Sequence, residues 1–146
     1  MTQPLLAILL LLPLSASAGE LDGKAIICVN ADERYQTPFG IEFKSDVVLK
    51  WVIWAKGTMA KLQVLYPEDV APKYWASATT VTWREGRYRL NRETLALQEF
   101  GKDAGVELSR YDCDASPSTD ALRESLEVAR LELQREIDAS MKDNKI

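Results

Sequence analysis

Histidine is absent from the 146 residues, and cysteine occurs only twice. Without histidine the chain lacks the commonest general base of enzymes and the commonest metal ligand. It also contains no G-x-S-x-G nucleophile turn, no S-x-x-K pair and no glycine-rich phosphate loop. The formal net charge of -4 argues against a general nucleic-acid binder, which carries a basic field. These absences disfavour an enzyme and predict neither a cofactor, a metal site nor a nucleic-acid partner.

Residues 1–18 contain no Asp, Glu, Lys or Arg. The apolar run Leu5–Leu12 is followed by Ala16-Ser17-Ala18, the A-x-A pattern of a secretory signal peptide cleaved after Ala18. The run is too short for a membrane span, which takes about 20 apolar residues. We therefore expect a soluble periplasmic or secreted protein that consists of residues 19–146 and keeps no stable membrane span.

Cys28 and Cys113 are the only cysteines. An exported chain meets an oxidising compartment, where such a pair forms a disulfide. The bond would close a ring over residues 28–113, which the chain-entropy argument values at roughly 4–5 kcal/mol. Two buried free thiols are the alternative, and we expect the disulfide.

Residues 24–113 carry the alternation and the β-branched and aromatic residues of strands, separated by turn signals every 8–12 residues. About eight strands are expected: Lys24–Asn30, Phe39–Lys44, Val47–Ala55, Leu62–Tyr66, Tyr74–Trp83, Arg87–Leu90, Thr94–Phe100 and Val106–Cys113. Such a run predicts a mainly β fold, a small antiparallel barrel or half-open barrel, over residues 19–115. The disulfide would join its first and last strands and so tie the two ends of the sheet together.

Residues 116–146 predict a C-terminal amphipathic α-helix that begins at Ser116-Pro117. One apolar stripe runs along it: Leu122, Leu126, Ala129, Leu133 and Ile137. Val128 and Leu131 lie off the stripe. The helix either packs on the barrel or binds a partner.

Four arginines fall within nine residues, beside two aromatic residues. This candidate interaction face comprises Trp83, Arg84, Arg87, Tyr88, Arg89 and Arg92. Arginine forks onto carboxylate and phosphate groups, so the face suits an acidic partner. The alternative is a hairpin edge that charge protects from further pairing.

The tryptophans and the paired carboxylates give weaker signals. Trp51 and Trp54, an odd step apart, should face opposite sides of one strand, whereas Trp75 and Trp83 should share a side. The pair Glu68-Asp69 would be the acid pair of a hydrolase that works with carboxylates alone, although a solvated loop is the simpler interpretation. Asp112 and Asp114 are two carboxylates on one strand end, which we interpret as solvated rather than as a cation site.

The segment Leu90–Leu97, followed by Tyr111-Asp112-Cys113, resembles an L-N-R-x-T-L-x-L … Y-x-C pattern found in small exported proteins of bacteria and their phages. The resemblance extends to the early cysteine, the FG-x-x-F strand and the polar C-terminal helix, and those proteins are uncharacterised. It implies that Leu90, Leu95 and Leu97 are core residues and that Asn91-Arg92-Glu93 is a turn.

By architecture alone, an exported small barrel with one disulfide is similar to the periplasmic inhibitors of C-type lysozyme. In that family a loop rich in serine and glycine enters the enzyme cleft. The nearest stretch here, Ala76-Ser77-Ala78-Thr79, lacks the glycines and is predicted to be strand. No inhibitor residue is therefore transferred to this chain.

Taken together, the sequence predicts an exported, non-catalytic binding protein of the cell envelope, inhibitor-like in kind, whose partner is an envelope protein or an anionic polymer. A carrier of a small apolar ligand inside the barrel is the first alternative. A hydrolase that uses carboxylates alone is the second.

Overall fold

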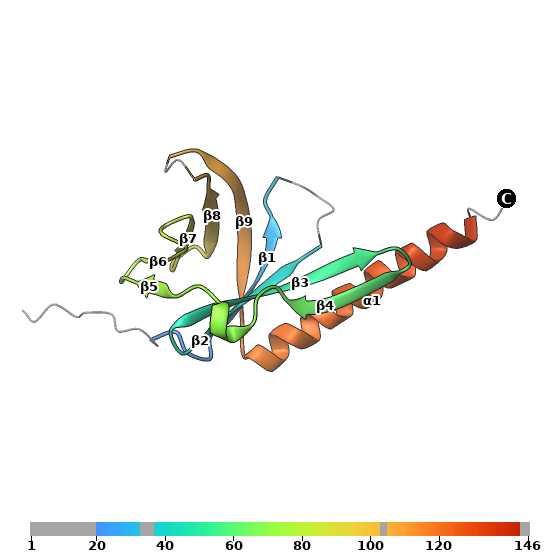
Figure 1. Cartoon of the computed structure of the whole chain (residues 1–146), viewed down its shortest axis with the longest axis horizontal. Coiled ribbons are helices and arrows are strands. Elements are labelled where there is room, and N and C mark those ends of the chain that lie inside the picture. Colours follow the sequence, from blue (N-terminus) through green and yellow to red (C-terminus); the bar gives the residue numbers. More distant parts are fainter. Residues whose placement is uncertain (1–19, 33–36, 103–104, 144–146) are drawn as a thin grey trace, which may run out of the picture.

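The computed structural model describes residues 20–32, 37–102 and 105–143, so the predicted signal peptide lies outside the described residues. The described chain forms nine strands, one 3₁₀ turn and one long helix (Figure 1). The elements are β1 (Ala25–Asn30), β2 (Phe39–Lys44), β3 (Val47–Lys56), β4 (Met59–Val64), η1 (Glu68–Val70), β5 (Tyr74–Ala76), β6 (Thr80–Trp83), β7 (Tyr88–Asn91), β8 (Ala96–Phe100), β9 (Glu107–Ser116) and α1 (Thr119–Asp143).

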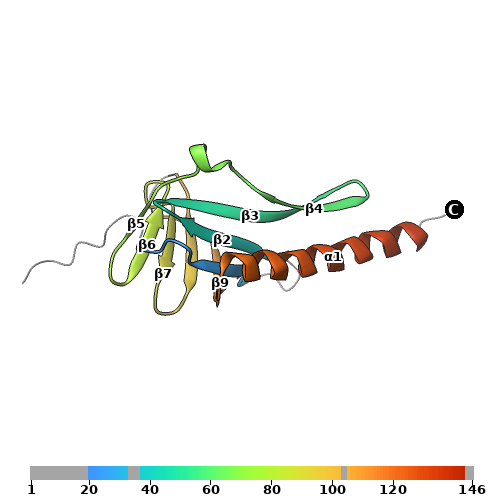
Figure 2. The same ribbon diagram turned by 90° about the horizontal axis from the view of Figure 1, so that it is seen from below.

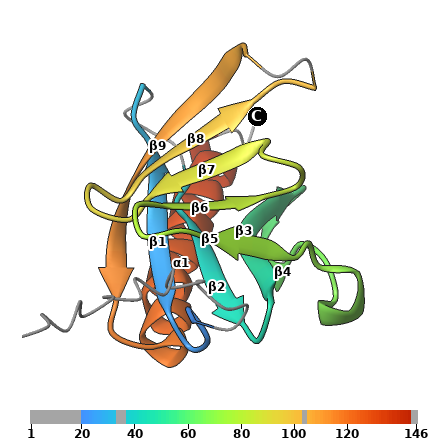
Figure 3. The ribbon, with the colours of Figure 1, turned by 90° about the vertical axis from the view of Figure 1, so that its left-hand side faces the viewer.

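All nine strands join one antiparallel sheet in the order β4-β3-β2-β1-β9-β8-β7-β6-β5. Figure 3 views this sheet from the side of β5 to β8, with β1, β2 and α1 behind them. The sheet is not closed, because β4 and β5 are its two edges. The prediction of a mainly β, half-open barrel with a C-terminal helix is confirmed.

The curl of the sheet brings edge strand β5 against the start of β3. Val47 and Lys73 form an isolated antiparallel bridge. Beside it, the Val48 amide donates to the Pro72 carbonyl at 2.8 Å and the Tyr74 amide donates to the Asp46 carbonyl at 3.1 Å. The barrel is therefore closed at this end only, while β4 continues away from it.

The prediction of one strand over Tyr74–Trp83 is wrong, because a turn at residues 77–79 divides it into β5 and β6. The Ser77 hydroxyl accepts the Thr80 amide at 3.0 Å, and the Ser77 amide donates to the Thr80 carbonyl at 2.8 Å. A serine side chain that bonds its own backbone neighbours competes with the strand ladder in this way. The predicted shared face of Trp75 and Trp83 is also wrong: Trp75 is 63% exposed and Trp83 only 3%.

The disulfide Cys28–Cys113 is confirmed, and its two residues lie directly opposite each other in the β1–β9 pair. Its position corrects the expectation that the bond ties the two ends of the sheet together. The bond crosses the middle of the sheet, not its two edges, because the first and last strands of the chain are neighbours at the centre of the strand order.

The main core lies on the concave side of the sheet, where its curl encloses side chains from strands of both halves. Its buried residues are Ile26, Cys28, Ile41, Phe43, Val48, Tyr74, Val81, Trp83, Leu90, Leu97 and Cys113. Phe43 meets the rings of Tyr74 and Trp83 edge-on, at 5.3 and 6.3 Å between centroids. Both halves of the open sheet thus contribute to a single core.

The turn that the resemblance implies is present. The Asn91 side-chain oxygen accepts the Glu93 amide at 2.9 Å and the Thr94 amide at 3.0 Å, which holds residues 92–94 as a turn. Leu90 and Leu97 are buried on either side of it. Leu95 packs partly buried against the same core.

Helix α1 packs on the opposite, convex side of β1 to β4 through Leu122 and Leu126, both fully buried (Figure 2). Val128 and Leu131, predicted off the apolar stripe, are exposed. The predicted start at Ser116 is wrong, because Ser116 pairs with Ala25 as the last residue of β9. The helix begins at Thr119, and the Ser118 hydroxyl caps it by accepting the Ala121 amide at 3.1 Å.

Candidate functional site

A cavity of about 320 Å³ opens at the mouth of the half-barrel, between β2, β3, the segment after β4 and the β6–β7 hairpin. Its lining residues are Phe39, Ile41, Val48, Lys50, Leu65, Tyr66, Pro72, Trp83, Arg84, Arg87, Tyr88 and Leu97. The lining divides into an apolar part that continues the core and three cationic side chains. We refer to this cavity as the mouth.

Trp83 and Tyr88 form the aromatic wall of the mouth. Their rings stack at 5.4 Å with only 9° between the planes. They lie opposite each other in the β6–β7 pair, which places both on the concave face. Trp83 is therefore a core residue that supports the mouth, and not an exposed part of an interaction face.

Glu99 of β8 organises the polar end of this wall. Its carboxylate accepts hydrogen bonds from the Tyr88 hydroxyl at 3.0 Å, from Arg87 Nη2 at 3.0 Å and from the Tyr111 hydroxyl at 3.2 Å. Burial, and next the nearby Glu99 charge, raise the pKa of Tyr88 to about 12. The Glu99 charge is thus already engaged by groups of the protein.

Arg87 is only partly satisfied by Glu99. Its buried Nε has no hydrogen-bond partner within the described part of the chain. A buried donor without an acceptor costs free energy.

Lys50 is the residue that the sequence analysis missed. It lies on β3 with its ammonium 4.3 Å above the Phe39 ring centroid and 6.0 Å from that of Tyr88. No carboxylate of the described residues lies within 4.0 Å of it. Burial lowers the pKa of Lys50, which is the response of a cation that has lost water without gaining a close counter-ion.

Arg84 completes the cationic side of the mouth from the β6–β7 turn. Its backbone and that of Glu85 both adopt left-handed conformations, with φ of 50° and 56°. Its guanidinium lies 4.7 Å from the Tyr66 ring centroid and lowers the pKa of that tyrosine. Two adjacent non-glycine residues in the left-handed region of φ store backbone strain. This strained turn carries Arg84 at the rim of the mouth.

The six residues of the predicted interaction face are divided among three places. Trp83, Arg84, Arg87 and Tyr88 line the mouth. Arg89 does not line the mouth; it lies against the Phe100 ring at 4.5 Å, in an adjoining hollow of about 400 Å³ that Arg84 and Arg87 also border. Side chains alternate along β7, so Arg89 and Tyr88 lie on opposite faces of that strand.

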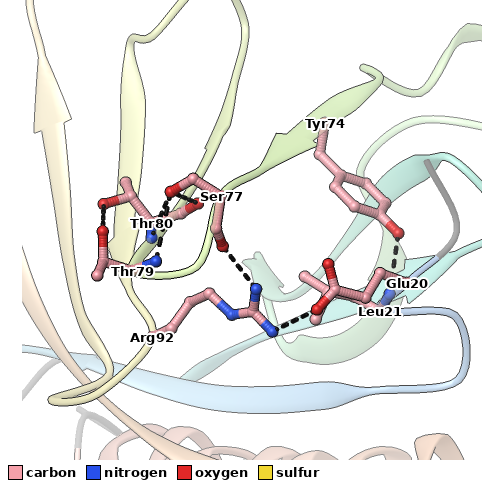
Figure 4. Close-up of polar contacts among 7 residues, drawn as sticks. All are labelled: Glu20, Leu21, Tyr74, Ser77, Thr79, Thr80 and Arg92. Carbon is pink, nitrogen blue, oxygen red and sulfur yellow. Dashed lines mark hydrogen bonds and ion pairs between the residues drawn. The ribbon is translucent and has the colours of Figure 1, made fainter. Parts of the chain in front are cut away.

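Arg92 lies at a third place, beside the β5–β6 turn (Figure 4). It donates to the Ser77 carbonyl at 2.6 Å and pairs with Glu20 at 2.8 Å. Next to it, the Leu21 amide donates to the Tyr74 hydroxyl at 3.3 Å. Arg92 therefore links the start of the described chain to the barrel, and its guanidinium is bound by groups of the protein itself.

The other carboxylates singled out by sequence lie on exposed surfaces. Glu68 of η1 pairs with Lys44 at 2.7 Å, and Asp69 is exposed beside it. Asp112 and Asp114 are exposed on β9. Within residues 20–32, 37–102 and 105–143, no group of three or more His, Cys, Asp or Glu residues is arranged to hold a metal ion.

No protein-family model, no curated protein and no solved structure matches this chain. Among the described residues, no helix has the length and apolar character needed to cross a bilayer.

Proposed function

We propose that this is an exported, non-catalytic binding protein whose site is the mouth, and that the site takes a carboxylate or similar anion attached to an apolar group. One observation carries the proposal: Lys50, Arg84 and Arg87 border a single apolar cavity. The nearest carboxylate, Glu99, is already held by Arg87 and two tyrosines. An anionic ligand would be attracted by the remaining positive charge in a partly desolvated site.

The charge distribution favours this proposal over a carrier for a purely apolar ligand. Such a ligand would bury the Lys50 ammonium further and give it no counter-ion, which costs free energy. An anion would instead pair with it and supply the missing counter-ion. The apolar carrier therefore becomes the second candidate, supported by the apolar lining alone.

Export is part of the proposal. The disulfide Cys28–Cys113 is typical of proteins that fold in an oxidising compartment. The apolar run and A-x-A pattern of residues 1–18 support secretion by a signal peptide cleaved after Ala18.

Calorimetric titration of the oxidised chain 19–146 tests the proposal with two probes of equal tail length, octanoate and heptyltrimethylammonium. We expect octanoate to bind and the cation not to bind. Lys50→Met should weaken octanoate binding by about tenfold or more, because it removes the charge and keeps the side-chain length. Arg89→Gln is the matched control, since it removes a cation from the same hairpin but outside the mouth. The affinity of this variant for octanoate should equal that of the wild type.

Equal binding of both probes would support the apolar carrier and contradict the anion site. Unchanged octanoate affinity in both Lys50→Met and Arg84→Gln would also overturn the proposal. Circular dichroism of each variant separates a lost contact from a lost fold.

A further inference from the structure

We propose that the partner is an acidic, extended segment of another protein. It lies along the face of the β3–β4 hairpin that is turned away from α1 and places one carboxylate in the mouth. This inference rests on the proposed function of the mouth and names its partner. The hairpin face is defined by Val52, Trp54, Lys56, Met59, Lys61 and Gln63.

The hairpin face continues directly from the mouth. The Leu65 amide donates to the Lys50 carbonyl at 2.7 Å, and both residues line the mouth. Three further cross-strand pairs follow towards the tip of the hairpin: Val52 with Gln63, Trp54 with Lys61, and Lys56 with Met59. Because side chains alternate along a strand, these residues lie on the same side of the sheet as Lys50 and Val48.

The other side of the hairpin is covered by α1, so the two sides have different roles. Trp51 and Leu62 pack against the Leu122 and Leu126 cluster. Farther out, Gln134 accepts the Ala60 amide at 2.8 Å, and Arg130 donates to the Ala60 carbonyl at 3.2 Å. The hairpin and α1 extend together away from the barrel (Figures 1 and 2). The helix thus supports the hairpin from behind and leaves the hairpin face open.

The hairpin face is hollowed and partly apolar. Trp54, Lys56, Met59, Lys61 and Gln63 line a depression of about 290 Å³. Trp54 is 50% exposed and Met59 is 54% exposed. Large apolar side chains exposed beside one another on a supported sheet face are typical of a contact surface.

The charge of this surface selects an acidic partner. No Asp or Glu lines either the mouth or the depression on the hairpin face. Lys56 and Lys61 form no ion pair with any described carboxylate. With Lys50, Arg84 and Arg87 they form a basic path on a chain whose net charge is -4. This local excess of positive charge is complementary to carboxylates.

The shape of the path favours an extended peptide over a lipid surface. Lys50 is recessed in the mouth, where the headgroups of a flat bilayer do not reach it, whereas a single side chain or chain terminus can. The residue pairs of the hairpin face recur every two residues, or about 6.8 Å, which is also the repeat of side chains on one side of an extended peptide. A segment with acidic residues at alternate positions would therefore turn a row of carboxylates towards the sheet, where they can reach Lys50 in the mouth and Lys61 and Lys56 on the hairpin face.

Fluorescence anisotropy tests the inference with a labelled peptide of about nine residues that alternates glutamate with serine or leucine, since the path is roughly 20–30 Å long. We expect binding to the oxidised chain 19–146, and no binding of the same peptide with glutamine in place of glutamate. The double variant Lys56→Glu/Lys61→Glu should weaken peptide binding by at least about tenfold. Octanoate, which occupies the mouth alone, should bind this variant as it binds the wild type.

The matched control is Lys24→Glu/Lys142→Glu, which makes the same change in net charge at two exposed lysines elsewhere. Equal weakening by both double variants would overturn the inference, because only the net charge would then matter. Octanoate binding without peptide binding would refute the acidic-segment partner and leave the mouth proposal intact. Failure of both probes would refute both proposals. A further outcome is that phosphatidylglycerol vesicles capture the protein in a way that requires Lys56 and Lys61, although the peptide does not bind. That result would overturn the inference and assign the hairpin face to a membrane surface.

Discussion

Lys50 is a lysine between two valines, Val48 and Val52, on one face of β3. Its contact with the Phe39 ring and the charge of Glu99 offset part of the lost hydration. A pKa that burial lowers means that the folded state binds the Lys50 proton less tightly than the unfolded chain does. The residue therefore reduces stability at neutral pH, as is common for groups kept for binding.

Lys50→Met should accordingly stabilise the protein at neutral pH. The unfolded chain keeps the proton up to the ordinary value of 10.5, whereas the folded chain releases it at a lower pH. The stability of the wild type thus rises as pH climbs between these two values, and the advantage of the variant shrinks over the same interval. Urea unfolding of both proteins at neutral pH and near pH 10.5 measures this difference. Lys61→Met, at an exposed lysine, should show neither effect, and a Lys50→Met protein less stable than the wild type would contradict the prediction.

Glu99 is the residue whose loss should disturb the wall of the mouth most. Glu99→Gln removes the charge that Arg87 and two tyrosines share, and it leaves the partly buried guanidinium without its anion. We expect a loss of about 1–3 kcal/mol in the free energy of unfolding. Glu107→Gln is the control, because it removes a more exposed partner from the Arg110 pair and should cost less than about 1 kcal/mol. If urea titration gave the same loss of unfolding free energy for both variants, the Glu99 contacts would contribute no more than an exposed ion pair.

At the scale of the elements, the approach of α1 to β2 depends on Gly40. A Cβ at this position would lie 2.9 Å from both methyl groups of Leu122 and from one methyl group of Leu126. Because both leucines are fully buried, neither can move aside without disturbing its neighbours. The glycine is thus required for close packing rather than for a special backbone conformation.

Gly40→Ala should therefore destabilise the protein by about 1–3 kcal/mol, the usual cost of overpacking a core. The control is Gly101→Ala, whose Cβ would meet its nearest neighbour only at 3.8 Å. In a Leu126→Ala background the cost of Gly40→Ala should fall, since the space is then available. Thermal unfolding measures the four variants and the wild type, and an unchanged cost in that background would refute the proposed clash.

The same helix protects the edge of the sheet. Edge strand β4 presents unpaired backbone groups on its outer side, which is a risk for association with other strands. Side chains of α1 bind both backbone groups of Ala60, and Gln134 also donates to the Thr58 carbonyl at 2.8 Å. The apolar stripe of the helix was evident from its spacing. The polar contact with Ala60 was not evident, because it joins residues that lie 70 and 74 positions apart.

For the whole molecule, the disulfide holds the junction between two halves of an open sheet. One half comprises β1 to β4 with α1 behind them, and the other comprises β5 to β9. The two halves meet through the β1–β9 ladder, which contains the bond, and through the short contact between β3 and β5. A cross-link at this position limits separation of the halves on unfolding.

The double variant Cys28→Ala/Cys113→Ala should lose about 2–5 kcal/mol in the free energy of unfolding, mainly because its unfolded chain is less restricted. Urea titrations of the wild type with and without reductant provide the comparison, and reductant should leave the variant unaffected. A wild type that unfolds at the same urea concentration in both conditions would show that the β1–β9 ladder holds without the bond.

The elements whose signals are local could be predicted from the sequence. Alternation and turn residues predicted seven of the strand positions, three- and four-residue spacing predicted α1, and the two cysteines predicted their bond. One failure came from a short-range contact and the other from a contact distant in sequence. The Ser77 hydrogen bonds split one expected strand, and the pairing of Ser116 with Ala25 delayed the helix.

Contacts between distant strands determine which strand edges stay open, which face of β3 is concave, and therefore what surrounds Lys50. Val47–Lys56 carries apolar residues on both faces, so alternation alone could not tell the side of the core from the side of α1. The curl of the sheet makes that choice through contacts between distant strands, such as Val47 with Lys73. It brings Lys50, Arg84 and Arg87 together at one mouth, while Arg89 lies in the adjoining hollow and Arg92 binds the Ser77 carbonyl. Local propensity sets strands and turns, and the mouth exists because burial of one shared core bends those strands around it.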